Sequence, residues 1–156
     1  MERELGGALR LTCQNQDCAY TFWGNPVPVV AGLVEHQGRV LLIQNREWPK
    51  GWWGLVTGFL EAGETPGQGI LREVDEELGL AGEIGGLIGV YSYLRRNQVI
   101  IAFHVKATGT VRVGSELRGY KAVEIDKLRP WPQATGKAVA DWLSLRKGEK
   151  RWGNWE

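Results

Sequence analysis

Cysteine is nearly absent from this sequence, which contains only Cys13 and Cys18 among its 156 residues. A chain of this length can bury a core that is stable without disulfides or a structural metal, so a disulfide-rich scaffold is excluded. An excess of charge of one sign is also lacking, because the formal net charge is +1. We therefore expect neither nucleic acid nor an anionic membrane surface as a partner.

Long hydrophobic runs are missing as well. No uninterrupted apolar stretch is long enough to span a bilayer, and the residues after Met1 lack the apolar segment of a secretion signal. We therefore expect a cytoplasmic protein, whose reducing surroundings keep both cysteines as free thiols. The length suits one domain, and a composition of 43% hydrophobic and 24% charged residues is typical of a globular one.

Glycine and tryptophan, by contrast, are abundant, with 22 and 8 residues. Large aromatic side chains usually pack in cores, so packing is the first interpretation of each tryptophan. From Val27 onward, apolar and β-branched residues alternate with turn residues, which predicts short strands. Gly38 suits the turn of a hairpin between the first two strands. The predicted strands cover residues 27–34, 39–45, 53–57, 99–107, 111–113 and 121–125.

Two helices are predicted. The first covers residues 66–78, because Thr65 is a good N-cap and Gln68 completes a capping box. Gly79 is placed to end this helix. The second helix begins at residue 135 or 136 and has apolar residues at helical spacing. Helices packed on a mixed sheet make an α+β or α/β sandwich the expected fold class.

Three glutamates gather on the first predicted helix. Glu73, Glu76 and Glu77 stand at positions i, i+3 and i+4, so they share one helical face and repel one another. Mg²⁺ would neutralise them, since it prefers carboxylate oxygens and takes its other ligands from water and phosphate. The alternative is an ordinary solvated helix face, as is usual for a run of like charges.

The residues around the glutamates favour the metal site. The segment that begins at Gly58 reads Gly, five residues, Glu64, seven residues, and then Arg-Glu-apolar-x-Glu-Glu-x-Gly-apolar from Arg72 onward. This pattern resembles the box of the Nudix hydrolase superfamily, and its strand–loop–helix context fits. The resemblance covers residues 27–146. It implies an α/β/α sandwich with a mixed sheet and hydrolysis of a nucleoside diphosphate linked to another moiety.

By position, the resemblance implies roles for the residues of the box. Glu73 and Glu77 correspond to the principal Mg²⁺ ligands, and Glu76 to a further ligand or a water-binding group. Mn²⁺ is the alternative ion. The backbone carbonyl of Thr57 is a further candidate ligand. The structural positions of the box, which include an arginine paired with a glutamate, are Gly58, Glu64, Arg72 and Gly79.

The general base of the reaction lies either within the box or in a later loop, according to the same resemblance. Glu116 is the candidate in the later loop. The alternative for Glu116 is a plain loop carboxylate, and geometry decides between the two. Weaker candidates for the base are Glu83, Glu124 and Asp126.

The two ends of the chain are expected to lie outside the domain, with residues 1–26 as a short appendage and residues 147–156 as a tail. Cys13 and Cys18 resemble the end of the zinc ribbon that precedes the catalytic domain in some Nudix enzymes. A structural zinc site usually needs four ligands, so we interpret the appendage as a degenerate remnant without zinc in one chain. Zinc shared between two chains stays open, as does a homodimer, which is common in the family.

Five residues outside the box are candidates for substrate binding. Arg46, expected to face the loop of the box, is a candidate phosphate ligand, as are Arg95 and Arg96. Trp52 and Trp53 are candidates for stacking on a base. The alternatives are basic loops and aromatic packing.

Three functions stay open as hypotheses, each with a small nucleotide as the partner. The favoured one is a diphosphatase for a substrate of the ADP-ribose, NADH or FAD type, because the residues after the box loosely resemble the ADP-ribose and FAD group. The second is a hydrolase of nucleoside triphosphates or dinucleoside polyphosphates. The third is a non-catalytic nucleotide-sensing module on the same fold, which the intact set of glutamates disfavours.

Overall fold

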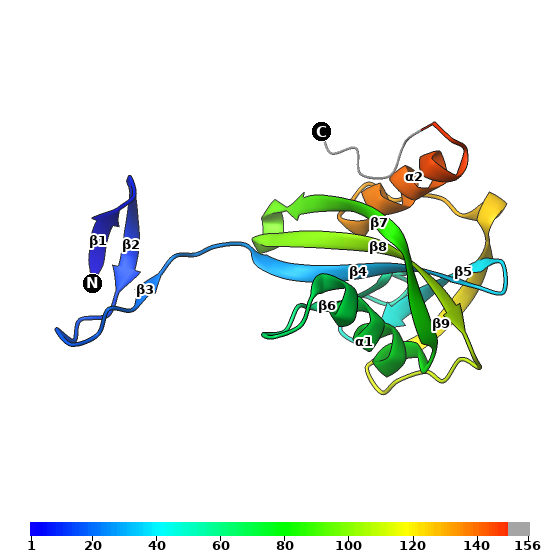
Figure 1. The fold of residues 1–156 in the computed structure, drawn as a ribbon, viewed down its shortest axis with the longest axis horizontal. Helices are drawn as coiled ribbons and strands as arrows, with labels where there is room; N and C mark the ends of the chain where they lie inside the picture. Colours follow the sequence, from blue (N-terminus) through cyan, green and yellow to red (C-terminus); the bar gives the residue numbers. More distant parts are fainter. Residues whose placement is uncertain (150–156) are drawn as a thin grey trace.

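Two sheets and two α-helices make up the computed structural model, which describes residues 1–149 (Figure 1). In these residues, no helix is long and apolar enough to cross a lipid bilayer. The predicted tail lies outside the described residues from position 150 onward. In chain order, the elements are β1 (Glu2–Leu5), β2 (Ala8–Thr12), β3 (Thr21–Phe22), β4 (Val27–His36), β5 (Arg39–Asn45), β6 (Val56–Phe59), α1 (Pro66–Leu78), β7 (Ala81–Tyr93), η1 (Leu94–Arg96), β8 (Gln98–Thr108), β9 (Leu117–Glu124), η2 (Ile125–Lys127) and α2 (Thr135–Arg146).

The larger sheet is mixed. Its strands follow the order β7-β8-β4-β5-β9, and β6 pairs with β4 beside this path. β4 runs parallel to β8, while the other strand pairs are antiparallel. The helices α1 and α2 lie on opposite faces of this sheet (Figure 1), since each belongs to a different hydrophobic cluster. The α/β/α sandwich with a mixed sheet is therefore confirmed.

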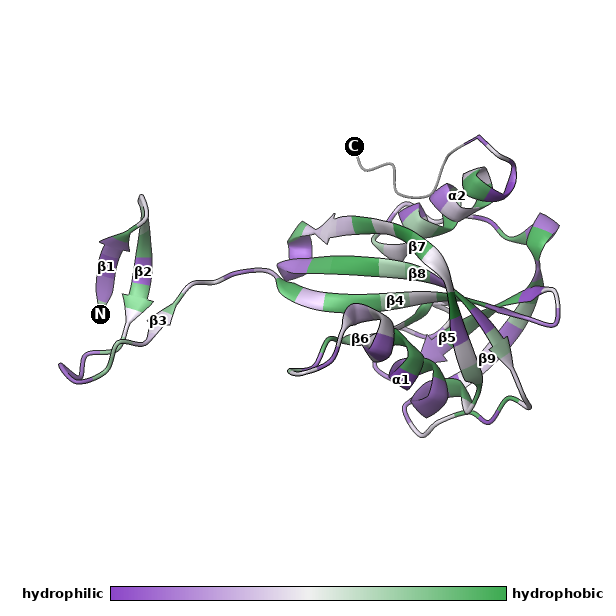
Figure 2. Cartoon of the chain, in the orientation of Figure 1, coloured by the Kyte–Doolittle hydropathy of each residue, from purple (hydrophilic) through white to green (hydrophobic). Residues whose placement is uncertain are grey.

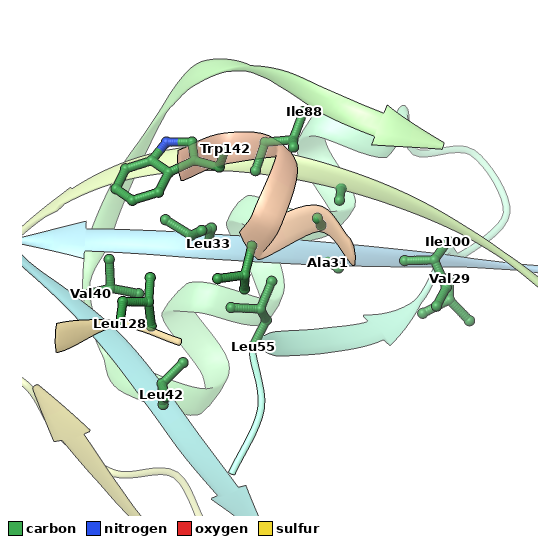
Figure 3. Close-up of a cluster of buried hydrophobic side chains, with 13 residues drawn as sticks. Val29, Ala31, Leu33, Val40, Leu42, Leu55, Ile88, Ile100, Leu128 and Trp142 are labelled. Carbon is green, nitrogen blue, oxygen red and sulfur yellow. The ribbon is translucent and has the colours of Figure 1, made fainter. Parts of the chain in front are cut away.

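The central strands supply both cores through alternating side chains. On β4, Val30 and Val34 pack with α1, whereas Ala31 and Leu33 pack with α2. Successive residues of a strand point to opposite faces, and a strand covered on both faces has a nearly continuous apolar sequence. Figure 2 shows this apolar character along β4 and β8. Figure 3 shows the cluster on the α2 side, to which the helix contributes Trp142.

Helix α1 begins and ends where the sequence predicts. The Thr65 hydroxyl accepts a hydrogen bond from the Gln68 backbone N–H at 3.3 Å, and the Gln68 side chain accepts one from the Thr65 N–H at 2.8 Å. These bonds form the expected capping box. At the other end, Gly79 has a φ of 63°, a left-handed conformation that costs glycine little. Both helix predictions are confirmed, because α2 also starts at the expected Thr135.

The strand predictions agree with the structure in part. β4, β5 and β8 lie where the sequence predicts strands. β6 begins only at Val56, and β9 begins already at Leu117, so the strands predicted at 53–57 and 121–125 are displaced. The strand predicted at 111–113 is wrong, because this segment bonds to the end of α1 instead of to a strand.

Residues 1–26 contain a separate three-stranded sheet with the order β1-β2-β3, which the sequence pattern does not predict. Figure 1 shows this sheet apart from the main body, joined to β4 by an extended segment. Where this segment meets the body, the Asn97 side chain donates a hydrogen bond to the Gly24 carbonyl at 3.0 Å. Cys13 and Cys18 lie between β2 and β3 as free thiols.

Candidate active site

The helix that carries the three glutamates packs closely on the sheet. Ile70, Val74 and Leu78 are fully buried in the core on this side. Gly32 of β4 allows the close approach, because a Cβ at this position would lie 2.9 Å from the Ile70 side chain. The helical period that buries this apolar stripe turns the glutamates onto an adjacent face.

Arg72 uses all five N–H donors of its guanidinium. Nε and Nη2 bind the two carboxylate oxygens of Glu64 at 3.1 and 2.9 Å, and Nη2 also donates to the Phe59 carbonyl at 3.1 Å. Nη1 donates to Glu73 at 2.7 Å and to Glu76 at 3.2 Å. The hydrogen bonds from Arg72 lower the pKa of Glu64, and together they tie the loop before α1 to the helix.

The Glu73 carboxylate fills the space beside Gly58. A Cβ at Gly58 would lie 1.9 Å from Oε1 of Glu73, so no larger residue fits without displacing the carboxylate. Burial raises the pKa of Glu73, although the hydrogen bond from Arg72 opposes this effect. Gly58 therefore leaves the space that the carboxylate of this candidate metal ligand occupies.

Glu77 is almost completely buried, with 4% of its surface exposed. Its Oε2 atom is buried and has no hydrogen-bond partner among the described residues. Burial, and then the charges of Glu73, Glu116 and Glu76, raise the pKa of Glu77 to about 8. Buried polar atoms are normally paired, so this unpaired oxygen is suited to a cation.

The loop before β9 carries Glu116 toward these glutamates. The N–H groups of Arg112 and Gly114 donate to the carbonyls of Leu78 and Glu77, each at 2.8 Å. These carbonyls belong to the last turn of α1, where a helix leaves acceptors unpaired. Gly114 lies so close that a Cβ there would be 2.4 Å from a helix carbonyl oxygen. The loop is thus bonded directly to the end of the helix.

An acidic cavity of about 110 Å³ lies where this loop meets the helix. Four carboxylates that face one space repel one another and favour a bound cation. The structure therefore brings together all four glutamates that the sequence nominates for catalysis, and their catalytic and metal-binding roles stay predictions. The residues that line the acidic cavity are Glu73, Glu76, Glu77, Gly114, Ser115 and Glu116.

The donor set of the acidic cavity fits a hard divalent ion. Its charged groups are all carboxylates, which Mg²⁺ prefers, and Glu77 offers an unpaired oxygen. Within residues 1–149, however, no three acidic, histidine or cysteine side chains already converge as metal ligands. Glu73 and Glu76 form ion pairs with Arg72, at 2.7 and 3.2 Å.

Arg46 contacts the loop that carries Glu116. Its Nε donates to the Ser115 carbonyl at 2.8 Å, and its backbone N–H donates to the Glu116 carbonyl at 2.9 Å. Arg118 in turn donates to the Arg46 carbonyl at 2.6 Å. Arg46 is therefore bonded to this loop, whereas the sequence suggests that it faces the loop of the box.

The remaining candidate binding residues belong mostly to a second cavity of about 310 Å³, called the aromatic cavity below. Its lining includes Trp52, Trp53 and Arg96. Thr57, whose carbonyl is a candidate metal ligand, also lines the aromatic cavity. Arg95 lies on the same short turn as Arg96 but lines neither the acidic nor the aromatic cavity.

Sequence reasoning misses two tryptophans of the aromatic cavity, Trp48 and Trp131. Trp48 lies on the connection between β5 and β6, close in sequence to Trp52, and this closeness is the one available signal. Trp131 lies in the loop before α2. No local motif marks it, because only the fold brings that loop beside the β5–β6 connection.

The weaker candidates for the general base lie away from the acidic cavity. Glu83 is on β7 and Asp126 on η2. Glu124 ends β9 and pairs with Lys127 at 2.5 Å. None of these three lines the acidic cavity, so geometry favours Glu116 among the candidates outside the box.

Comparison with known proteins yields one family and several distant relatives. The model of the NUDIX domain matches residues 25–143. An ADP-ribose pyrophosphatase of Methanocaldococcus jannaschii is 28% identical over 135 residues, which cover 83% of this chain and 80% of the relative. A MutT-like protein of Streptomyces ambofaciens is 41% identical over 91 residues, and this match spans 58% of each protein.

Solved structures show the same fold. A NUDIX hydrolase from Nitrosomonas europaea has a TM-score of 0.81 and 26% identity, and the match covers 99% of this chain and 90% of that one. An ADP-ribose pyrophosphatase from Streptococcus suis has a TM-score of 0.65 over 85% of this chain and 97% of its own. Its identity of 20% supports a likeness in fold alone.

Proposed function

Since the chain belongs to the NUDIX family of hydrolases, we propose that it hydrolyses the diphosphate linkage of a nucleoside diphosphate derivative with the help of Mg²⁺. The substrate we propose is of the ADP-ribose, NADH or FAD type. The observation that carries the proposal is the meeting of Glu116 with three glutamates of α1 around one acidic cavity.

The ion would be held by Glu73, Glu76 and Glu77. The unpaired, buried oxygen of Glu77 is the main support for this position, and the carbonyl of Thr57 is a further candidate ligand. When bound, Mg²⁺ offsets the negative charge that the diphosphate develops in the transition state. Mn²⁺ shares the preference for carboxylate oxygens and is the alternative ion.

Glu116 is the residue that we propose as general base. It lines the acidic cavity from the loop, opposite the helix that carries the other carboxylates, and Arg46 is bonded to the same loop. A base must lie within hydrogen-bond reach of the water that it activates. Glu116 would take a proton from that water while the oxygen of the water forms a bond to phosphorus. The bridging P–O bond then breaks, which leaves a nucleoside monophosphate and a phosphorylated second product.

The type of substrate is supported by the archaeal relative. That protein is named an ADP-ribose pyrophosphatase, and it matches over 83% of this chain. Its 28% identity supports a shared kind of linkage, while the group on the far side of the diphosphate depends on other residues.

A substrate panel tests the proposal. The protein is incubated with Mg²⁺ and, separately, with ADP-ribose, NADH, FAD, a nucleoside triphosphate and a dinucleoside polyphosphate, and the products are separated by chromatography. We expect AMP from the first three substrates and no release once a chelator removes the ion. Faster turnover of the triphosphate or the polyphosphate would favour the second hypothesis, and turnover of none would overturn the proposal.

A further inference from the structure

Residues 112–116, called the base loop below because they end in Glu116, are bonded on two sides. On one side, the backbone N–H groups of Arg112 and Gly114 donate to carbonyls at the end of α1. On the other side, the base loop meets Arg46, the residue that directly follows β5. The helix therefore holds the first part of the base loop, and Arg46 holds the part that carries Glu116.

The two hydrogen bonds from Arg46 enclose the Cα atom of Glu116. Nε of Arg46 donates to the Ser115 carbonyl at 2.8 Å, and its backbone N–H donates to the Glu116 carbonyl at 2.9 Å. The first carbonyl belongs to the peptide unit before the Cα of Glu116, and the second belongs to the unit after it. Peptide units are planar, so holding both of them sets the direction in which the Glu116 side chain leaves the backbone.

Arg46 is itself fixed by the sheet. Arg118 on β9 donates to the Arg46 carbonyl at 2.6 Å. The register between β5 and β9 shifts between Gln44 and Asn45, and Asn45 then pairs with Leu117, the residue after Glu116. Such an irregularity bends a strand locally and re-aims the residues beside it. The position of Arg46 thus depends on the protein alone.

A role as phosphate ligand fits Arg46 less well. It lines neither the acidic nor the aromatic cavity. Arginine binds phosphate best with a fork of parallel donors, and the Nε donor at one edge of this fork is already bonded to the Ser115 carbonyl. The geometry favours a place behind the base loop over direct contact with a diphosphate.

We propose that Arg46 is a positioning residue that acts through Glu116, by holding its carboxylate in the acidic cavity. The inference rests on the proposed function, in which Glu116 is the general base. A base must lie within hydrogen-bond reach of its water, and a small displacement of a reacting group lowers the rate strongly. Loss of the side-chain bond should therefore lower kcat and leave KM almost unchanged, because substrate binding does not depend on the base.

Three variants separate the N–H donor of Arg46 from its charge. Arg46→Gln keeps an N–H group at the same number of bonds from the backbone as Nε, but has no charge. Arg46→Lys keeps the charge and places its donor one bond farther out, and Arg46→Met keeps neither. We expect kcat to fall about tenfold for the Met and Lys variants and clearly less for Gln. A near-normal rate for Lys with a raised KM for Gln would overturn the inference, since a phosphate ligand behaves in this way.

Arg129→Met is the matched control. Arg129 is exposed, as Arg46 is, and its Nη1 also donates to backbone carbonyls, those of Asp126 and Leu128. It lines neither the acidic nor the aromatic cavity. Its loss should leave kcat and KM unchanged. An equal fall in kcat for the Arg129 and Arg46 variants would contradict a specific role for Arg46.

A double-mutant cycle shows whether Arg46 acts through Glu116. Once Glu116→Gln has removed the base, Arg46→Met should lower kcat little further, because two groups that act as a unit are not additive. Effects that multiply in the double variant would overturn the inference.

Amide hydrogen exchange gives a second readout, apart from hydrolysis. In chelator, the amides of Gly114 and Leu117 should exchange faster in Arg46→Met than in the wild type or in Arg129→Met. Hydrolysis by the wild type with unchanged kcat and exchange in Arg46→Met would overturn this inference alone. Failure of the proposed function differs, because the wild type itself would then hydrolyse no substrate of the panel.

Discussion

The guanidinium of Arg72 binds both carboxylate oxygens of Glu64, at 3.1 and 2.9 Å. Two bonds of this kind need a planar fork of donors, which lysine lacks. We expect Arg72→Lys to lower the melting temperature by roughly 5 °C. We also expect turnover to fall at least about tenfold, because the loop and Glu73 lose their fixed positions. Thermal unfolding by circular dichroism and turnover on the best panel substrate measure the two effects.

The control for this variant is Arg39→Lys. Arg39 also pairs with a glutamate, Glu124, but at 4.0 Å and with both side chains about half exposed. Such surface pairs contribute little to stability, so neither melting temperature nor turnover should change. If the Arg72 and Arg39 variants had the same melting temperature and turnover, the two hydrogen bonds between Arg72 and Glu64 would have no special role.

Glu77→Gln removes the candidate ligand with the unpaired oxygen. We expect turnover to fall at least about a hundredfold, because the charge that holds the ion beside the diphosphate is lost. The metal-free variant should be at least as stable as the wild type, since glutamine avoids a buried charge. Turnover with Mg²⁺ and unfolding in chelator separate these effects. The control is Glu83→Gln at an exposed position of β7. A near-normal rate for Glu77→Gln would contradict the assignment.

Glu77 also makes the stability of the metal-free protein depend on pH. Its pKa is about 8 in the folded protein and near 4.5 when unperturbed. A carboxyl whose pKa rises on folding binds its proton more tightly in the folded state, so stability falls as pH rises through this window. We expect the melting temperature in chelator to fall between about pH 5 and pH 8. Mg²⁺ should raise it more at the higher pH.

The variant Glu77→Gln checks the origin of this pH dependence. Glutamine does not titrate, so the fall in melting temperature between about pH 5 and pH 8 should become smaller. The same buffers and chelator are used for both proteins. A fall of equal size in the variant would assign the effect to other groups.

Glu116→Gln separates the general base from the metal ligands. We expect kcat to fall by about a hundredfold, a size typical of losing a general base. The Mg²⁺ concentration for half-maximal rate should change little, because Glu73, Glu76 and Glu77 remain. Rates over a range of Mg²⁺ concentrations measure both quantities, with Glu124→Gln as a control outside the acidic cavity. An unchanged kcat would place the base within the box.

Strand β7 shows why part of the sheet is not predictable from sequence. Its 13 residues include Gly82, Gly85, Gly86 and Gly89, and glycine is depleted in strands. The register with β8 shifts near Gly86 and again near Gly89, as in strands with bulges. Pairing with the long strand β8 therefore determines β7, and local propensity does not indicate it.

Helix α1 is predictable because its signals are local. Thr65 and Gln68 begin it and Gly79 ends it, all within a few residues of the helix. The segment 111–113 has the composition of a strand, but the N–H of Arg112 bonds to a helix carbonyl. That partner is distant in sequence, so residue preferences alone point to the wrong structure.

The candidate site likewise contains residues that local sequence places and residues that it does not. Helical spacing places Glu73, Glu76 and Glu77 together, and this much follows from the sequence. Glu116 joins them only because its loop bonds to the end of α1. Trp131 joins the aromatic cavity from the loop before α2. Residues that depend on such long-range contacts need the structure to be placed.

Strand β6 stands between the acidic and the aromatic cavity. A molecule that occupies both and is cut at its middle would leave two fragments on different sides of the strand. Each fragment would then dissociate from its own cavity, without waiting for the other. Two independent affinities would set the order in which the products leave. An excess of one product would then inhibit the enzyme without competing with the other product.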